Sequence, residues 1–238
     1  MNLELSIKLT ARLQKIADQV TMGHRVADIG TDHGYIPIYL LKNKISPFVI
    51  AGDINEQPLK CAEANIASNN LSHRIEARLG GGLSILKPGE VDTIIIAGMS
   101  GLSISDLLND SKEVVRNLDI LILQPMQAQS ELRKYLVRNS FIIEKNILVK
   151  EGRHIYEIIV AKPGEWKKVI DPIYYDVGLY IYNNPRPLAM EFVGRKIKTT
   201  REIIRDISKN ISGLSAEKLK EMKEKLKKLE EVYSCLQR

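Results

Sequence analysis

The chain has 238 residues, of which 44% are hydrophobic and 27% charged, and such proportions are typical of globular proteins and exclude wholesale disorder. No stretch approaches the roughly 20 apolar residues of a membrane span, and the first residues lack the apolar core of a secretory signal. Two distant cysteines, Cys61 and Cys235, and four scattered histidines give no metal-ligand spacing, so we expect a cytoplasmic protein without a membrane or metal partner.

The net charge of +6 is concentrated near the C-terminus. Residues 1–164 carry 19 basic and 18 acidic side chains, whereas residues 165–238 carry 16 and 11. Clustered Lys and Arg side chains release counterions from phosphates, so this basic segment favours a polyanionic partner. The alternative is a solvated, Lys-rich helical surface with no partner.

In chain order, the first predicted element is an amphipathic helix over residues 3–20, because Leu5, Leu9, Leu13 and Ile16 recur at helical spacing. Strands and helices then alternate. Strands are expected at 25–29, 48–53, 74–79, 91–97 and 118–123, and helices at 34–43, 57–69, 102–109 and 127–139. Two further strands are expected at 141–149 and 154–162.

This order predicts the architecture of an α/β protein. The almost wholly apolar strands indicate burial on both faces, as in a parallel sheet covered by helices. Alternation predicts right-handed βαβ units. The link of four residues before residue 154 is too short for a crossover, so the last two strands must form a hairpin. Five parallel strands followed by a hairpin are typical of the seven-stranded, Rossmann-like sheet of class I methyltransferases.

The character of the sequence changes after residue 163. Residues 165–187 are expected to be irregular, and two helical patterns follow, divided at Ser212-Gly213, with Ser215 as the N-cap of the second. Their apolar residues recur at alternating steps of four and three: Val193, Ile197, Thr200, Ile204, Ile207, Ile211, Leu219, Met222, Leu226, Leu229, Tyr233 and Leu236. They predict an antiparallel, coiled-coil-like helical hairpin. We therefore expect two domains, 1–163 and 164–238, in a monomer, although the seam could also pair with a second copy.

The turn after the first strand, Gly30 to Gly34, is the first candidate binding feature. Its G-x-x-x-G spacing differs from the dinucleotide fingerprint. Asp28 and Asp32 would repel a pyrophosphate but tolerate an ammonium or sulfonium group, which favours S-adenosylmethionine over NAD. The alternative is a plain strand-to-helix turn.

Three further segments are predicted to reach the same edge of the sheet. Asp53 ends the second strand, where a carboxylate can accept both ribose hydroxyls of an adenosine-containing cofactor. Residues 80–83 follow the third strand, where the adenine ring is expected, and residues 97–101 follow the fourth, where methyl transfer is expected. Each glycine cluster alone is more often a simple turn, so the argument depends on their falling at successive strand ends.

Several longer motifs carry a resemblance to a known family. They are DIGTDHGYIPIYL (28–40), AGDI (51–54), RLGGGL (78–83), VDTIIIAGMSG (91–101), LILQP (121–125) and GRHIYEII (152–159). With them the chain resembles the bacterial tRNA adenine-N1 methyltransferases that modify adenine 22 in the D-loop, the TrmK family. Membership would imply S-adenosyl-L-methionine as methyl donor and tRNA as acceptor.

The expected cofactor-binding residues follow from the strand ends and from this resemblance. They are Asp28, Gly30, Thr31, Gly34, Asp53, Ile54, Gly81, Gly82, Leu83, Ala97, Gly98 and Met99. Three positions depart from the family pattern. Gly81 stands where Asp or Asn is usual, Ser100 interrupts a glycine run, and Met126 stands where Asn commonly follows Gln-Pro.

Methylation at adenine N1 needs little chemistry from the protein, because the ring nitrogen has an in-plane lone pair that can attack the sulfonium methyl directly. Alignment is then the main contribution. Asp32 and His33 are the candidate catalytic residues, through negative potential or proton acceptance, although Asp32 could instead cap a helix and His33 could merely pack on the cofactor. The residues expected to contact the acceptor are Arg12, Ser100, Gln124, Pro125 and Tyr156, with Lys196 and Lys198 on tRNA phosphates.

Three other functions stay open on the sequence alone. A class I methyltransferase acting on a small molecule or a protein shares the same fold. A non-catalytic RNA-binding protein with a degenerate methyltransferase fold is left open by Gly81 and Met126. A nicotinamide enzyme is disfavoured by the turn spacing and by the acidic residues.

Overall fold

A computed structural model describes residues 7–167, 169–209 and 213–238. The chain divides into two compact units, one reaching Lys168 and the other running from Val169 to Arg238. Within the described residues, no helix is both long and apolar enough to cross a membrane.

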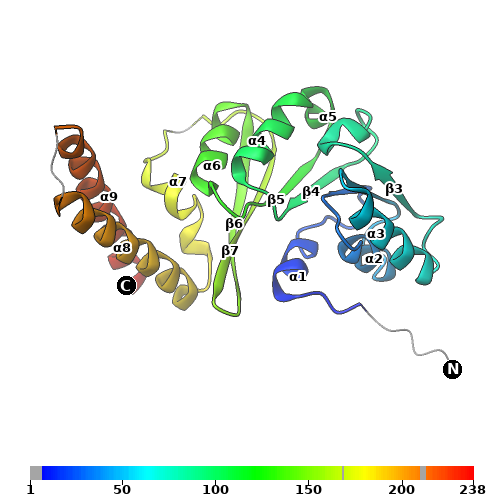
Figure 1. Ribbon diagram of the computed structural model, residues 1–238, viewed down its shortest axis with the longest axis horizontal. Helices are drawn as coiled ribbons and strands as arrows, with labels where there is room; N and C mark the ends of the chain where they lie inside the picture. Colours follow the sequence, from blue (N-terminus) through cyan, green and yellow to red (C-terminus); the bar gives the residue numbers. More distant parts are fainter. Residues whose placement is uncertain (1–6, 168, 210–212) are drawn as a thin grey trace. The chain divides into compact units, whose positions relative to one another are not determined.

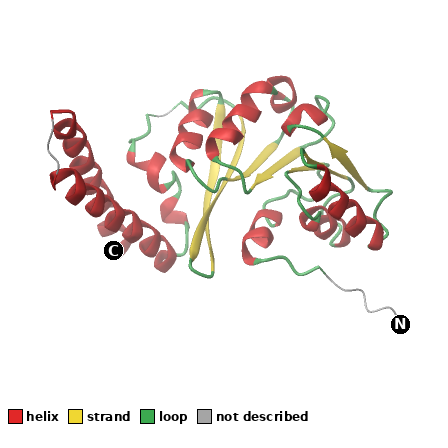
Figure 2. Cartoon of the chain, viewed as in Figure 1, coloured by secondary structure: helices red, strands yellow, loops and turns green. Residues whose placement is uncertain are grey.

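The first unit is organised around one seven-stranded sheet with the order β3-β2-β1-β4-β5-β7-β6. The strands are β1 (Val26–Ile29), β2 (Val49–Asp53), β3 (Ile75–Leu79), β4 (Thr93–Ala97), β5 (Ile120–Gln124), β6 (Phe141–Glu151) and β7 (His154–Pro163). The first five run parallel, and β7 lies antiparallel between β5 and β6. Figure 2 shows the long β6–β7 hairpin. The predicted class of fold is confirmed.

Helices cover both faces of this sheet, as the apolar strands require. Helices α1 (Ala11–Ala17), α2 (Tyr35–Lys42) and α3 (Glu56–Ser68) lie on one side, and α4 (Gly101–Asp110), α5 (Lys112–Arg116) and α6 (Gln129–Arg138) lie on the other (Figure 1). A 3-10 turn, η1 (Gly82–Ile85), follows β3. Every residue of β1 and β2 is buried, so the centre of the core lies between the two helical layers.

The first helix is shorter than the sequence predicted, and this is a correction. Helix α1 begins after Thr10, whose hydroxyl accepts a hydrogen bond from the amide of Leu13 at 3.4 Å, and it ends before Asp18. Leu9 and Val20 are still buried, because the chain on either side of the helix also packs on the core. Residue 5 lies outside the described residues. The short helix α5 was not predicted at all.

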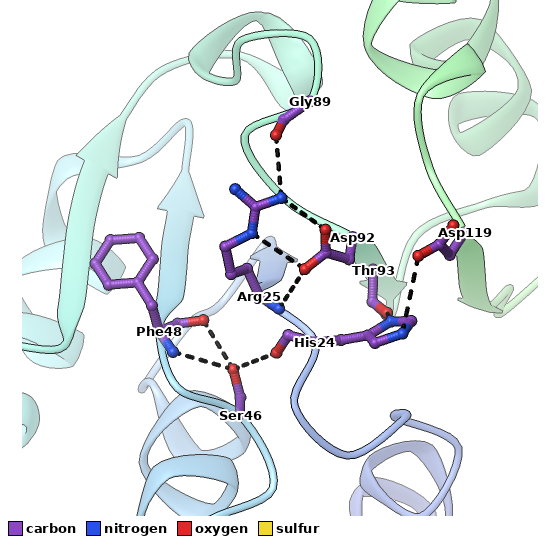
Figure 3. Close-up of polar contacts among 8 residues, drawn as sticks. All are labelled: His24, Arg25, Ser46, Phe48, Gly89, Asp92, Thr93 and Asp119. Carbon is purple, nitrogen blue, oxygen red and sulfur yellow. Dashed lines mark hydrogen bonds and ion pairs between the residues drawn. The ribbon is translucent and has the colours of Figure 1, made fainter.

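Polar side chains bind one another where the parallel strands begin, at the amino edge of the sheet (Figure 3). The Arg25 guanidinium donates to both carboxylate oxygens of Asp92, at 2.6 and 3.1 Å, and to the carbonyl of Gly89 at 3.1 Å. The amide of Arg25 adds a bond to Asp92 at 2.8 Å. Nδ1 of His24 lies 2.9 Å from the hydroxyl of Thr93. These contacts join the starts of β1 and β4.

A buried ion pair fixes α6 to the hairpin. Arg133 on α6 is fully buried and its guanidinium contacts the carboxylate of Glu157 on β7, which is also buried. Because neither charge reaches water, removing one partner would leave the other uncompensated, at a cost of about 3–5 kcal/mol.

The second unit contains α7 (Ile173–Val177), a 3-10 turn η2 (Ile181–Asn183), α8 (Arg186–Lys209) and α9 (Gly213–Gln237). The prediction that 165–187 is irregular is therefore wrong in part. The prolines of that segment misled it, because Pro187 lies in the first turn of α8, where a missing backbone N–H costs nothing.

Helices α8 and α9 pack against each other as the predicted hairpin. The antiparallel arrangement follows from two contacts: the guanidinium of Arg186 donates to the carbonyl of Leu236, and Arg201 pairs with Glu230 at 2.7 Å. The seam therefore closes within one chain. Helix α9 begins at Gly213, so Ser215 lies inside the helix and the prediction that it is the N-cap is wrong. The predicted seam residue Ile211 and the dividing residue Ser212 lie outside the described residues.

Candidate active site

A cavity of about 420 Å³ opens at the carboxyl edge of the sheet, where β1 and β4 end. Its size falls within the range of small-molecule sites, about 300–1,000 Å³. It is lined by Arg12, Leu13, Asp28, Gly30, Thr31, Asp32, His33, Tyr35, Ile36, Ala97 and Gly98. Eight of these eleven are residues that the sequence assigned to the cofactor, to catalysis or to the acceptor.

The turn after β1 is shaped by its neighbours. The amides of Gly30 and Thr31 both donate to the carbonyl of Gly52 on β2, at 2.8 and 3.1 Å. Gly30 has a φ of +79°, and a Cβ there would approach the Met99 methyl group at 3.0 Å. A side chain is therefore disfavoured twice at Gly30, by conformation and by space.

Gly34 has a different role from the one expected. It has a φ of +70°, and a Cβ on it would lie 3.4 Å from the Cβ of Ala62 on α3. The close approach that this glycine allows is thus between α2 and α3. Gly34 is not among the residues that line the cavity, and its role is to let α2 begin close to Ala62 of α3.

Two buried carboxylates lie beneath the turn. Asp28 lines the cavity and accepts a hydrogen bond of 2.8 Å from the Thr31 hydroxyl. Burial raises the pKa of Asp28 to about 6; the Thr31 bond opposes this rise and the charge of nearby Asp53 adds to it. Asp53, buried at the end of β2, accepts a 2.7 Å bond from the amide of Asn55. A cation in the cavity would therefore meet negative charge that the fold leaves largely uncompensated.

Arg12 brings a positive charge to the opposite wall. Its guanidinium donates to the side-chain oxygen of Gln124 at 2.6 Å and stacks 5.4 Å from the ring centre of Tyr156. Its amide donates to the carboxylate of Glu151 at 2.9 Å, and this bond lowers the pKa of Glu151. Contacts from β5 and β7 thus hold the side chain of Arg12 at the cavity, and Glu151 on β6 holds its backbone.

Asp32 and His33 lie at the mouth. The Asp32 side chain is 69% exposed and that of His33 44%, and a carboxylate oxygen of Asp32 lies 3.6 Å from Nε2 of His33. The His33 ring also lies 5.3 Å from that of Tyr35. Helix α2 has no side-chain cap, so the alternative that Asp32 caps it is not what the structure shows. Both side chains are accessible to a second substrate.

The loop after β3 divides into an open and a packed part. Gly81 is open, and the nearest atom to a Cβ placed there is the δ-methyl of Ile54, 3.8 Å away. Gly82 is covered, because a Cβ on it would collide with Leu107 of α4 at 2.2 Å. Leu83 is buried in the core. Gly82 and Leu83 therefore shape the loop, and Ile54 and Gly81 are the members of this group left accessible.

The loops after β4 and β5 are tied to each other. The amide of Met126 donates to the carbonyl of Met99 at 2.8 Å. Ser100 caps α4, its hydroxyl accepting a bond of 3.0 Å from the amide of Ser103, which is a role the sequence interpretation did not foresee. Gln124 is completely buried and donates to the carbonyl of Pro125 at 3.1 Å. Gln124 therefore positions the guanidinium of Arg12 and is not itself exposed to a ligand.

Comparison with known proteins identifies the family. A methyltransferase-domain family profile matches residues 9–159. The tRNA (adenine(22)-N(1))-methyltransferase of Bacillus subtilis is 30% identical over 231 residues, covering 95% of this chain and 97% of that protein. The chain belongs to this family of tRNA methyltransferases. The resemblance seen in its motifs is confirmed.

Solved structures of this family share the fold along almost the whole chain. The B. subtilis enzyme TrmK, described as an M1A22 tRNA methyltransferase, is 29% identical with a TM-score of 0.88, covering 95% of this chain and 99% of its own. Streptococcus pneumoniae Sp1610 in complex with S-adenosyl-L-methionine is 26% identical with a TM-score of 0.81, covering 95% of this chain and 100% of its own.

Some residues at the cavity were not among those predicted from the sequence. Leu13, Tyr35 and Ile36 also line the cavity. Tyr35 and Ile36 directly follow the glycine turn, so their position in the first turn of α2 was a usable signal. The amide side chain of Asn65, which donates to the carbonyl of His33 at 3.0 Å, comes from the next helix and gave no such signal.

The predicted phosphate contacts, Lys196 and Lys198, lie on α8 in the second unit. The Lys196 ammonium lies 4.7 Å from the ring centre of Phe192, whereas Lys198 is exposed. Within the described residues, no group of three His, Cys, Asp or Glu side chains is arranged to hold a metal ion.

Proposed function

We propose that this chain transfers a methyl group from S-adenosyl-L-methionine to N1 of adenine 22 in tRNA. The observation that carries the proposal is the glycine-walled cavity at the carboxyl edge, with the buried carboxylate of Asp28 in its lining, in a chain of this family. The curated relative from B. subtilis acts at this position, and Sp1610 binds this donor.

The residues present fit the donor. S-adenosyl-L-methionine supplies an electrophilic methyl group on a sulfonium, and the carboxylate of Asp28 provides the negative potential that favours this cation. We assign the ribose hydroxyls to the carboxylate of Asp53 at the end of β2. Ile54 beside open Gly81 offers an apolar surface to the adenine, in place of the acidic or amide side chain usual in the family.

Arg12 is the natural partner of the donor's carboxylate. Among the described lining residues it is the only permanent cation, and Gln124 and Tyr156 hold its guanidinium in place. A preorganised guanidinium loses little entropy when it binds a carboxylate. Ala97 and Gly98 leave the facing wall free of side chains that would obstruct a ligand.

We assign Asp32 and His33, at the mouth of the cavity, to the acceptor. Methylation at N1 makes the adenine cationic, and a carboxylate at the mouth stabilises that charge as it develops. His33 can accept a proton from the exocyclic amine. Because N1 lies on the Watson–Crick edge, the base must be unpaired or flipped to reach the cavity.

We assign tRNA binding to residues 164–238, which contain the second unit, and donor binding to residues 1–163. The excess of 16 basic over 11 acidic residues after residue 164 supports this division. Lysines on a helical hairpin can hold the phosphate backbone and fix the register of the target base without reading sequence. The exposed, free thiols of Cys61 and Cys235 fit a reducing, cytoplasmic setting.

The deciding experiment is a methyl-transfer assay with labelled donor, followed by mass spectrometry of the digested tRNA. We expect 1-methyladenosine in a transcript with adenine at position 22 and none in a transcript with guanine there. Labelling of metabolites or protein in place of tRNA would point to another acceptor. Absence of donor binding by calorimetry would point to a non-catalytic RNA-binding protein.

The role of the hairpin is tested separately by replacing Lys196, Lys198 and Lys209 with Gln. We expect tRNA binding to weaken at least about tenfold and its salt dependence to flatten by about two to three, because three phosphate contacts are lost. Donor affinity should not change. The matched control replaces three lysines of the first unit, Lys44, Lys60 and Lys87; an equal loss in the control would refute the assignment.

A further inference from the structure

A second cavity, of about 380 Å³, lies away from the proposed donor site. Its walls come from α5, the C-terminal ends of α4 and α6, and the paired ends of β6 and β7. Helices α4 and α6 start at the carboxyl edge of the sheet and run back across it, so their C-terminal ends lie at the amino edge. Figure 1 shows α4, α5 and α6 on one side of the sheet.

Three cations line this cavity: Lys112 and Arg116 on α5, and Arg138 on α6. Within the described residues none of them takes part in an ion pair. No carboxylate is among the lining residues, although residues 1–164 as a whole have 19 basic and 18 acidic side chains. A local excess of unpaired positive charge on a nearly neutral unit favours an anionic ligand.

The floor of the cavity is apolar. Val115 and Phe141 are buried there, and Tyr135 stands beside them. Burial raises the pKa of Tyr135, with Asp110 and Asp106 on α4 adding to the rise. Those carboxylates repel an anion from that side, so the anionic group is expected toward Arg116 and Arg138, with a flat apolar group above Phe141.

We propose that this cavity binds a nucleotide, with the phosphate on Arg116 and Arg138 and the base on the apolar floor beside Tyr135. The guanidinium fork suits a phosphate, and an aromatic floor suits a base of any sequence. The nucleotide is either a free mononucleotide or one unit of an RNA strand.

A competing explanation assigns these cations to helix stability alone. Arg116 and Arg138 each stand in the last turn of their helix, where a positive charge compensates the helix dipole. Lys112 is the first residue of α5, where a positive charge has no such benefit, and the dipole explanation does not account for it.

The test uses the full chain and uridine 5′-monophosphate, which avoids the adenosine expected in the donor cavity. We expect saturable binding that weakens about tenfold or more in R116Q/R138Q, because two charge-assisted contacts are lost. The matched control K44Q/K87Q, which also removes two exposed charges from the first unit, should bind like the wild type. Uridine and inorganic phosphate, each lacking half of the ligand, should bind more weakly.

A short oligouridylate distinguishes the two sources of nucleotide. Much tighter binding of the oligomer would assign an RNA strand, and equal binding a free nucleotide. No binding by the wild type, or equal binding by R116Q/R138Q, would overturn the proposal, and a drop in thermal stability without any binding would leave helix stabilisation as the explanation. If R116Q/R138Q does not fold, Lys112→Gln replaces it, with weakened binding again expected.

Discussion

At the amino edge of the sheet, polar side chains are bonded to one another, whereas at the carboxyl edge they face an open cavity. Arg25 and Asp92 share two side-chain bonds and a backbone bond. Asp28 on β1 accepts a bond from the Thr31 hydroxyl and Asp53 at the end of β2 accepts one from the Asn55 amide, both neutral donors, and the two carboxylates repel each other. The two edges of one sheet therefore divide stability and ligand binding between them.

Glycine shows the same contrast. Gly98 at the carboxyl edge and Gly89 at the amino edge both have a positive φ, of +88° and +76°, and a Cβ on either would meet no atom within 4 Å. Only Gly98 lines a ligand cavity. Similar backbone conformations thus serve a plain turn in one place and the wall of a cavity, which we propose holds the donor, in the other.

The largest effect is expected from Asp53→Ala. Removing the carboxylate that we assign to the two ribose hydroxyls should weaken donor binding about 100-fold, because charge-assisted hydrogen bonds contribute about 1.5–3 kcal/mol each. Calorimetry measures this. Asp92→Ala removes a carboxylate from the other edge and should leave donor affinity unchanged. A similar loss in both variants would erase the distinction between the edges.

The next effect concerns the pH dependence of stability. The pKa of Asp28 is raised from 3.8 to about 6, so the folded state binds this proton more tightly than the unfolded state does. Stability is therefore greatest at low pH for this group and falls as pH rises through about 6, by up to about 3 kcal/mol. Asp28→Asn should be about 2 kcal/mol more stable than the wild type at about pH 8 and no more stable at about pH 4.

Denaturant titrations at the two pH values measure this difference in unfolding free energy. For Asp92 the pH dependence of stability is expected to have the opposite sign. The Arg25 bond lowers the pKa of Asp92, so its contribution is present above the ordinary pKa and is lost as pH falls. Asp92→Asn should therefore lose stability at neutral pH. If Asp28→Asn is destabilising at about pH 8, then burial does not disfavour the ionised carboxylate of Asp28 and the expected rise in its pKa is wrong.

A smaller effect separates the two glycines. Alanine at either position should cost about 1 kcal/mol, because a positive φ is unfavourable for a residue with a Cβ. Gly98→Ala should also weaken donor binding about tenfold by adding a methyl group to the cavity. Gly89→Ala should not affect binding. Thermal unfolding measures the stability of both variants, and titration with the donor measures their affinities. Equal donor affinities of the two variants would contradict the proposed difference between the glycines.

The smallest effect is expected from Arg25→Ala. Its contacts with Asp92 and Gly89 are partly exposed, and such pairs contribute about 1 kcal/mol after solvent screening. The unfolding free energy should fall by that amount with methyl transfer unchanged. A loss of activity in the folded variant would show that the amino edge also affects the chemistry.

Much of the fold was predictable because the central strands consist almost wholly of apolar residues. Segments such as 91–97 and 118–123 admit no other interpretation than buried strands, and the short link before β7 required a hairpin. The link was predicted to have four residues, and in the structure it is only Gly152 and Arg153. The start of α1 was not predictable, because Leu9 is apolar and buried in either conformation. Helix α5 was missed because its five residues are too few to show a period.

The site was predictable where function depends on backbone position along a strand. Asp28, Gly30 and Gly98 follow from strand ends alone. The hydrogen bonds of Gln124 and Ser100 could not be predicted in this way. Gln124 accepts from Arg12 because of tertiary packing, and Ser100 accepts from the amide of Ser103 because it caps a helix. A side chain at the proper edge can still be turned inward, and only the three-dimensional neighbours decide this.

The contacts of the β6–β7 hairpin with Arg12 have a consequence for synthesis on the ribosome. Arg12 is among the first residues to be translated, yet its amide is held by Glu151, 139 residues later. Until that hairpin has emerged and folded, the guanidinium lacks its aromatic neighbour and the amide lacks its carboxylate acceptor. A nascent chain therefore cannot fix Arg12 at the cavity before the hairpin has left the exit tunnel, so this wall of the cavity is complete only in a chain that has completed its sheet.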